Sequence, residues 1–460
     1  MQPEHLQFGG GASVTVLHPL VAIGVVMAVV LILALPRHKV IPPFLLAFLS
    51  IPIGQVIVLG GVHFTMHQIL ILTVLARMAA FPGSASEGRF AGGFNALDRV
   101  VVLWSLSAFI VVSLQWIETQ ATIKSLGDLI VSLGGYLAVR FLIPDREALL
   151  RTVKVLAVIC VIQGACMVSE QFTHQNVFSF AGAASPTIRD GHIRSEGVMG
   201  SLWGGVFGGV LVPMFFWLWK EGKSRMAACV GLTGATAMAF ASHASTSWLA
   251  CGAALGGLCF WPLRRQMRLL RWGIVVTLVG LHLVMHGPVW SLIEKIDLTG
   301  GSSNYHRYML VDNCVRHFSD WWLLGYKNYG DWGFDMWDLC NQFVAVALTG
   351  GLITLILFIA IYSRSFAAIG NARKEVEGDR AQEWLLWCLG SSLFANVMAS
   401  FGINYMVHLA MALFAVLACV SVVTLSAKQA AVRDIDSTVE FSLASAPGTT
   451  GNYLPLREIR

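Results

Sequence analysis

Apolar residues along this chain gather into long runs that are separated by short polar connections. Most runs hold about 17 to 23 residues, the length at which a helix crosses the roughly 30 Å hydrocarbon core of a bilayer. The pattern therefore predicts an all-α, polytopic integral membrane protein with twelve or thirteen membrane helices. The predicted spans are 17–35, 40–59, 64–80, 100–116, 123–142, 152–170, 197–219, 226–242, 246–262, 272–289, 341–362, 384–402 and 405–425.

Composition supports this class and excludes a soluble enzyme. Hydrophobic residues make up 56% of the chain and charged residues 12%, about half the charge of a soluble domain. The net charge of +5 does not indicate a nucleic-acid partner, because the basic residues lie in short clusters between apolar runs. We expect membrane lipid, and no nucleic acid, as a partner.

The distribution of lysine and arginine predicts the orientation. One side of the predicted map carries 24 of the 31 basic residues, and short loops rich in lysine and arginine face the cytoplasm. The amino terminus is then outside and the carboxyl terminus inside. The first run lacks a preceding basic region and cleavage site, so we expect it to remain as a membrane span.

The chain divides into a membrane domain, 1–425, and a cytoplasmic tail, 426–460. The membrane domain includes two long external loops, 171–196 and 290–340, and long polar loops are commonly functional. The tail has too few periodic apolar residues to form a core, so we predict that it is disordered.

Cysteine usage and known motifs point to no cofactor. Only Cys314 and Cys340 lie outside the predicted spans; they could form a disulfide, although two free thiols are the simpler interpretation. CxxC, HExxH, GxxxxGK[ST] and GxGxxG are all absent from the sequence, which gives no support to a zinc, ATP or dinucleotide site. Two overlapping GxxxG patterns, at Gly204, Gly205, Gly208 and Gly209, predict close helix packing.

The second external loop is rich in aromatic residues. Such side chains suit the headgroup zone of a membrane, and they also suit stacking on sugar rings. Both interpretations stay open. The aromatic residues are Trp290, Tyr305, Tyr308, Trp321, Trp322, Tyr326, Tyr329, Trp332 and Trp337.

External basic residues are a sharper signal, because the positive-inside rule disfavours them there. Arginine presents a planar fork of donors that suits phosphate, so converging arginines would form a diphosphate clamp. The alternative is a loop salt bridge, for instance between Asp312 and Arg316. The residues concerned are Arg189, Arg194, Arg307, Arg316 and Lys327.

The segment 305–320 has helical apolar spacing without proline or glycine. Arg307 and Arg316 would lie half a turn apart on this helix, so one straight helix cannot aim both at one pocket. We therefore assign function to Arg307 and structure to Arg316. His306 and His317 share a third face with Asn313.

Carboxylates follow near the start of the next span. Asp338 could cap the helix that begins near 341, while Asp335 or Asp338 could instead accept a proton from an acceptor hydroxyl. A carboxylate near basic residues stays ionised, which suits a base.

With these residues in view, the second half of the chain resembles the O-antigen ligase and O-antigen polymerase superfamily of bacterial membrane glycosyltransferases. Arg194-Ser-Glu-Gly197 resembles the external arginine segment of that family. Arg307 with Trp321-Trp-Leu-Leu-Gly-Tyr326 resembles its arginine, spacer and glycine turn. Cys340-Asn341 through Thr349-Gly-Gly-Leu352 resembles its His-Asn pair and glycine-leucine helix.

The resemblance implies a GT-C-like, metal-independent glycosyltransferase of the bacterial inner membrane that builds cell-surface polysaccharide. It would move glycan from a polyprenyl-diphosphate donor to a glycan, lipid or protein acceptor at the periplasmic face, with no cofactor. The implied diphosphate residues are Arg194, Arg307, Arg189 and Lys327, the candidate catalytic residues are Asp338, Asp335, His306 and His317, and the acceptor or loop residues are Asn341, Tyr305 and Cys340.

Two departures from the family pattern bear on the base. Cys340 stands where the family has histidine, and a thiol is a poor substitute for imidazole. The polar segment 242–247 also lacks the arginine of the family's Ser-Arg segment.

Two other functions stay open. A transporter or flippase for lipid-linked or amphipathic substrates would place ionisable residues along a membrane path, whereas the predicted span centres hold almost none. A non-catalytic assembly subunit could use the aromatic loop for docking.

Overall fold

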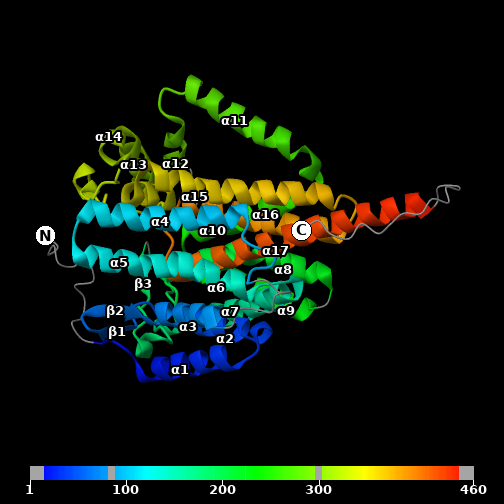
Figure 1. The fold of residues 1–460 in the computed structure, drawn as a ribbon. Helices are drawn as coiled ribbons and strands as arrows, with labels where there is room; N and C mark the ends of the chain where they lie inside the picture. Colours follow the sequence, from blue (N-terminus) through cyan, green and yellow to red (C-terminus); the bar gives the residue numbers. More distant parts are fainter. Residues whose placement is uncertain (1–14, 81–88, 190, 223, 296–302, 445–460) are drawn as a thin grey trace.

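The computed structural model describes residues 15–80, 89–189, 191–222, 224–295 and 303–444, and Figure 1 presents it as a long helical bundle. Helices form nearly all of the regular structure in these ranges, so the prediction of an all-α polytopic membrane protein is confirmed. Seven helical stretches here are long and apolar enough to cross a membrane. They are α4 (Ala96–Trp116), α5 to α6 (Thr119–Leu142), α7 (Arg146–Thr173), α8 (Ser201–Glu221), η5 to α11 (Trp261–Val284), α15 (Gln342–Glu375) and the Val407–Leu425 part of α17.

The other predicted spans contain shorter or less apolar helices, so in the described residues the helices that are long and apolar enough to cross number fewer than the twelve or thirteen predicted. All thirteen runs nevertheless contain helix. The remaining helices are α1 (Pro19–Ala34), α2 (Ile41–Ser50), α3 (Met66–Ala80), α9 (Arg225–Ala241), α10 (Ser245–Cys259) and α16 (Arg380–Ser400). Short elements between them are η2 (Arg37–Lys39), η3 (Ile130–Gly134), η4 (Ser179–Ala181), η6 (Val289–Ser291), α12 (Leu292–Lys295), α13 (Ser303–Arg316), α14 (Phe318–Trp321) and η7 (Tyr329–Trp332).

The predicted span 40–59 is wrong in its second half. Helix α2 ends at Ser50, and the chain then forms β1 (Val56–Leu59), which pairs antiparallel with β2 (Val62–Thr65). Gly60 and Gly61 join the strands with φ angles of 58° and 80°, which glycine adopts without strain. An apolar run alone does not distinguish a helix from a strand of β-branched residues.

Glycines bring the central helices into close contact, as the GxxxG patterns predict. A Cβ atom added at Gly208 of α8 would lie 2.9 Å from the Ala235 carbonyl oxygen of α9, and one at Gly164 of α7 would lie 2.7 Å from that of Gly234. Helix backbones therefore touch directly here, which is how small residues stabilise membrane helix pairs.

Helix α15 is broken at Gly351, which has φ 69° and ψ −177°. The break frees backbone groups that bind the external turn after α14: Tyr326 N donates to Leu348 O at 2.7 Å and Leu352 N to Trp322 O at 2.8 Å. The turn is thus fixed against the wall of the bundle.

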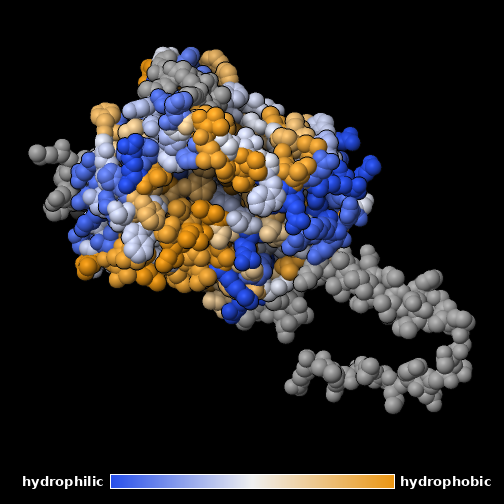
Figure 2. Space-filling model, turned by 90° about the horizontal axis from the view of Figure 1, so that it is seen from above, coloured by the Kyte–Doolittle hydropathy of each residue, from blue (hydrophilic) through white to orange (hydrophobic). Residues whose placement is uncertain are grey.

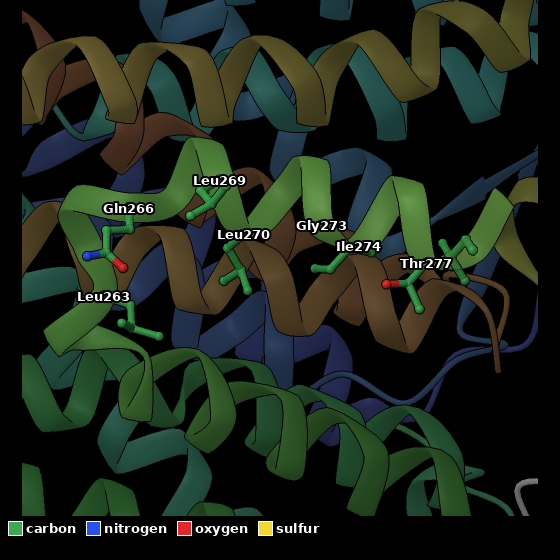
Figure 3. Close-up of a pocket in the computed structure, with 8 residues that line it drawn as sticks. Leu263, Gln266, Leu269, Leu270, Gly273, Ile274 and Thr277 are labelled. Carbon is green, nitrogen blue, oxygen red and sulfur yellow. The ribbon is translucent and has the colours of Figure 1, made fainter. Parts of the chain in front are cut away.

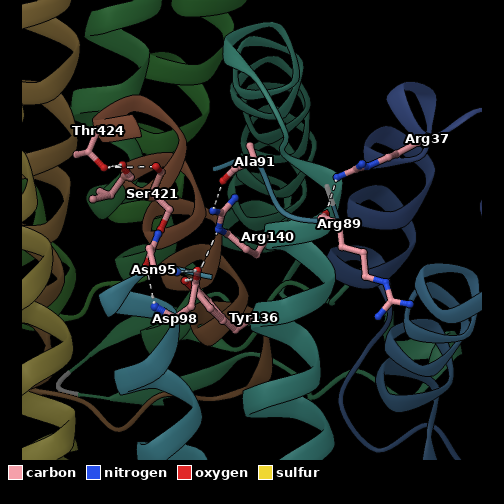
Figure 4. Close-up of polar contacts among 10 residues, drawn as sticks. Arg37, Arg89, Ala91, Asn95, Asp98, Tyr136, Arg140, Ser421 and Thr424 are labelled. Carbon is pink, nitrogen blue, oxygen red and sulfur yellow. Dashed lines mark hydrogen bonds and ion pairs between the residues drawn. The ribbon is translucent and has the colours of Figure 1, made fainter. Parts of the chain in front are cut away.

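A buried polar network joins α4 to α6 at the opposite end of the bundle from α13 (Figures 1 and 4). Asp98 accepts a hydrogen bond from Tyr136 Oη at 2.5 Å and lies 3.4 Å from Arg140 Nε, while Arg140 also donates to Ala91 O at 2.7 Å. Asn95 and Asp98 also cap α4 reciprocally. These charges lie at helix ends and bind each other, so they are explained as fold-stabilising contacts.

The prediction of a disordered tail differs from the structure over 426–444. Helix α17 (Val407–Ala444) continues to Ala444, because no proline or glycine interrupts the chain between these residues. The rest of the predicted tail, 445–460, lies outside the described residues.

Candidate functional site

Part of the first external loop is a small hairpin with a basic face. Strand β3 (Thr187–Arg189) pairs antiparallel with β4 (His192–Arg194), and Arg189 lies opposite His192. Opposed residues and alternate residues share one face of a strand pair, so Arg189, His192 and Arg194 lie on the same face. Ile188 and Ile193 occupy the other face.

Buried polar side chains of α7 hold this hairpin in place. The fully buried Glu170 carboxylate accepts hydrogen bonds from Glu196 N at 2.7 Å and Gly197 N at 2.9 Å. Gln171 Nε2 donates to Ser195 Oγ at 2.7 Å and to Ala241 O at 2.9 Å, which links the hairpin to the end of α9. The position of Arg194 is therefore set by a rigid helix end rather than by a free loop.

Helix α13 in the second external loop carries Arg307 to the start of α10. Arg307 donates through Nη1 to Asn304 Oδ1 at 2.8 Å and through Nη2 to Thr246 Oγ1 at 2.9 Å, with Ser245 Oγ at 3.5 Å. Its Nε is buried and has no hydrogen-bond partner among the described residues. None of the ion pairs found in that part of the chain involves Arg307.

The two external loops meet at Arg307. Burial lowers the pKa of the Arg307 guanidinium. The interaction with Cys340 raises this pKa, the positive charge of Arg189 lowers it, and the negative charge of Asp338 raises it. Arg189 of the hairpin is therefore near enough to Arg307 of α13 for the two positive charges to repel each other. Two arginines near one another favour the binding of an anion between them.

A second contact joins the hairpin to the turn between α9 and α10. The rings of His192 and His243 stack with centroids 5.0 Å apart. Partial burial lowers the pKa of His243, and repulsion from His192 and then Arg194 lowers it further. Arg194 therefore lies beside this stacked pair, on the basic face of the hairpin.

Cys340, Asp338 and His306 gather beside Arg307. Their possible ligand atoms all lie within 4.8 Å of one another, so the three could hold a metal ion, a possibility that the sequence motifs did not indicate. Arg307 opposes this role, because its guanidinium interacts with the Cys340 sulfur and places a positive charge at the same point. His306 Nε2 lies 2.9 Å from the Asp338 carbonyl oxygen. Since a carbonyl only accepts, His306 Nε2 is the donor in this contact.

Cys340 itself is a neutral thiol at physiological pH. Burial raises its pKa to about 11, although Arg307 acts in the opposite direction. The cysteine that occupies the family's histidine position is therefore unsuited to accept a proton. Cys314 and Cys340 are both free, which confirms the simpler of the two interpretations.

Asn341, not Asp338, caps helix α15. Its side-chain oxygen accepts hydrogen bonds from Phe343 N at 3.0 Å and Val344 N at 3.2 Å. The capping role considered for Asp338 is therefore wrong, and that exposed carboxylate remains free for other chemistry. The Asn341 side chain is buried.

Two other predicted residues, His317 and Lys327, make their contacts away from Arg307. His317 Nδ1 lies 3.2 Å from Asp320 Oδ2, and its ring stacks on Trp332 at 4.5 Å. His317 directly follows α13 (Ser303–Arg316), about 16 Å along the helix axis from His306. Lys327 lies over the Trp116 ring at 5.0 Å, at the end of α4.

Asp335 and Tyr305 lie on exposed surfaces. Asp335 accepts a hydrogen bond from Trp337 Nε1 at 3.2 Å and has a positive φ of 56°. Tyr305 contacts Tyr308 with ring centroids 6.2 Å apart. No contact joins either of the two to Arg307 in the described part of the chain.

Arg316 pairs with Asp312, as the loop salt-bridge alternative predicts. The distance from Arg316 Nε to Asp312 Oδ2 is 2.7 Å. The two arginines of α13 therefore differ. Arg316 neutralises a carboxylate on its own helix, whereas Arg307 has a buried Nε without a partner in the described chain.

Sequence reasoning missed four residues of this region: Ser245, Thr246, His192 and His243. The segment 242–247 is a polar cluster between two apolar spans, and that was the available signal for Ser245 and Thr246. No sequence pattern marks the stacked histidines, which come together only through the fold. Searches of protein-family models and of curated proteins found no match to this chain.

Proposed function

We propose that this membrane protein is a glycosyltransferase that uses a polyprenyl-diphosphate-linked glycan at the external face, as an O-antigen ligase or polymerase does, with a GT-C-like fold. The observation that carries the proposal is the state of Arg307. Its guanidinium is partly buried and has no ion-pair partner in the described chain, and Arg189 lies nearby. Leaving such a cation without a partner costs stability, and an anionic substrate would supply the missing interaction.

In the proposed reaction, the acceptor hydroxyl oxygen attacks the anomeric carbon of the donor sugar. The bond from that carbon to the phosphate oxygen breaks, and the polyprenyl diphosphate leaves with the bonding electrons. Arg307, Arg189 and Arg194 stabilise the negative charge that develops on the diphosphate. The product is a longer lipid-linked glycan or a glycan on a new acceptor.

The hydroxyl proton goes to His306 Nδ1 or to the Asp338 carboxylate. Both lie beside Arg307, whereas Asp335 and His317 make their contacts elsewhere.

The test compares Arg307→Ala with Arg316→Ala, two substitutions of the same kind on one helix. Protein in nanodiscs receives a polyprenyl-diphosphate oligosaccharide with candidate acceptors, and products are measured by mass spectrometry. We expect Arg307→Ala to reduce transfer by at least about a hundredfold, in line with the loss of a donor to a developing anion. Arg316→Ala should keep most activity, because the Arg316 side chain is exposed and the buried Asp312 keeps its hydrogen bond from Trp290 Nε1.

Each result decides between functions. Longer lipid-linked chains would identify a polymerase, and glycan on a different acceptor would identify a ligase. Equal activity of the two variants would overturn the role of Arg307. Donor moved to the opposite leaflet without transfer would instead support a transporter.

A further inference from the structure

Helix α11 (Met267–Val284) presents an apolar surface that the rest of the bundle leaves uncovered. No residue of α11 is buried, and Figure 1 shows this helix standing away from the other helices. An apolar hollow of about 490 Å³ runs along it, and Figure 3 shows Leu270, Ile274 and Thr277 among the side chains that line it. Seen from the α11 side, apolar side chains cover the middle of the molecule and hydrophilic ones gather toward its ends (Figure 2). In a membrane, acyl chains or another protein would cover this surface.

The end of the hollow that adjoins η5 (Trp261–Gln266) is strongly basic. Four arginines lie within eight residues of the chain. Basic residues at the end of a membrane helix are commonly explained by topology alone. Topology does not explain why only some of these charges have a partner. The four residues are Arg264, Arg265, Arg268 and Arg271.

Two of the four arginines are neutralised by acidic residues. Arg264 Nε lies 2.8 Å from Glu383 Oε2, and this ion pair is largely shielded from solvent. Arg265 Nη2 lies 3.2 Å from Glu377 Oε1 in an exposed pair. The charges of these two arginines are therefore already balanced within the chain.

Arg268 and Arg271 are not balanced in this way. Both residues are exposed, and neither forms an ion pair in the part of the chain that the structure describes; Arg271 Nε donates to Met267 O on its own helix at 3.2 Å. Residues three apart are neighbours on a helix surface, so both guanidinium groups can bind one anion. Arg271 precedes Ile274 by three residues and Leu278 by seven, so it lies beside the hollow that these two side chains line. A pair of cations thus borders one end of the hollow.

Trp272 indicates the depth of this pair in the membrane. Its side chain is 64% exposed, and an exposed tryptophan on a membrane helix prefers the headgroup zone. The neighbouring arginines then lie at the level of lipid phosphates, whereas Ile274 and Leu278 lie at the level of acyl chains. The order from basic to apolar along α11 matches the order from headgroup to tail in a phospholipid.

We propose that this face of α11 binds an anionic phospholipid, with the headgroup phosphate at Arg268 and Arg271 and an acyl chain in the hollow. Basic residues beside a membrane helix attract anionic lipids, and each charge near the surface adds to the affinity. A zwitterionic lipid would fill the hollow, but its headgroup has no net charge to balance the two cations. This inference goes beyond the proposed function and does not rest on it, because the site lies at the end of the bundle remote from Arg307.

The test measures the binding of two lipids with the same acyl chains, phosphatidylglycerol and phosphatidylcholine, to the full chain in detergent by native mass spectrometry. Arg268→Gln combined with Arg271→Gln removes the two cations. Arg99→Gln combined with Arg225→Gln is the matched control. These are exposed arginines in the first turns of α4 and α9, and their substitution changes the net charge by the same amount.

Gly273→Leu tests the hollow separately from the charges. Gly273 lines the hollow, and a Cβ atom added there would meet nothing within 4 Å, so leucine fills the space without a clash. Gly280→Leu on the same helix is the control, because an added Cβ there also meets nothing within 4 Å and Gly280 does not line the hollow. Leucine favours helix over glycine, so both variants should fold.

We expect the wild type to bind phosphatidylglycerol on the order of tenfold more tightly than phosphatidylcholine, because two cations face the anionic headgroup. The Arg268→Gln and Arg271→Gln variant should lose this preference, while its control keeps it. Gly273→Leu should weaken the binding of both lipids severalfold and keep the preference, and Gly280→Leu should match the wild type.

Three results would overturn the assignment. The first is equal affinity of the wild type for the two lipids, or a preference that survives the loss of Arg268 and Arg271. The second is competition by glycerol phosphate at an equal concentration, which would place a free phosphate compound at the arginines. The third is a dimer that Gly273→Leu abolishes, which would assign the hollow to a second copy of this chain.

Discussion

At the residue scale, the two arginines of α13 illustrate what sequence reasoning can reach. Helical spacing alone separates Arg307 from Arg316, and the ion pair of Arg316 with Asp312 agrees with that separation. The cap of α15 could not be assigned in the same way. Asp338 and Asn341 are both capping residues near a helix start, and only the backbone decides which one lies at the boundary.

Cys340 should behave as an unreactive thiol. Burial raises its pKa to about 11, so the thiolate fraction at pH 7 is very small and rises about tenfold with each pH unit up to that value. We expect the rate at which iodoacetamide alkylates Cys340 to follow this rise between pH 7 and pH 10, as measured by peptide mass spectrometry. Cys340→Ser should keep most transfer activity. Rapid alkylation at pH 7 that no longer increases with pH would contradict the assignment.

At the element scale, the break in α15 and the turn after α14 depend on each other. The sequence shows both glycine motifs, but their pairing across the fold is not visible in it. Gly325 and Gly351 both have φ of 69°, and each backbone lies against the other segment. The turn that follows the helix of Arg307 is thereby held to the bundle.

Gly351→Ala should destabilise the protein and reduce transfer. The new Cβ would lie 2.6 Å from the Leu323 carbonyl oxygen, and alanine is strained at positive φ, so we expect a loss of at least about 2 kcal/mol. Thermal unfolding in detergent measures the stability. Gly370→Ala on the same helix is the control, because its Cβ meets nothing within 4 Å and alanine favours helix. Equal unfolding temperatures of the two variants would show that the turn does not rely on the break.

At the scale of the whole molecule, different charged residues lie at the two ends of the helical bundle. Arg264 binds Glu383 at 2.8 Å and Arg265 binds Glu377 at 3.2 Å at the end of the bundle remote from Arg307. Counting spans predicts that the two long external loops share a side, and they do meet at one end of the fold. The contact between the basic hairpin and α13 could not be predicted, since it depends on how α7, α9 and α10 pack.

The ends of the bundle should face opposite sides of the membrane. Phe334 is 90% exposed near the Arg307 end, and the Glu377 side chain is 59% exposed at the other end. We expect a charged maleimide that does not cross membranes to label Phe334→Cys in intact cells, and Glu377→Cys only after permeabilisation, with the wild type as background. Basic loops are retained in the cytoplasm, so the arginines near Glu377 favour this orientation. The reverse labelling pattern would place Arg307 in the cytoplasm, where an external transfer reaction could not use it.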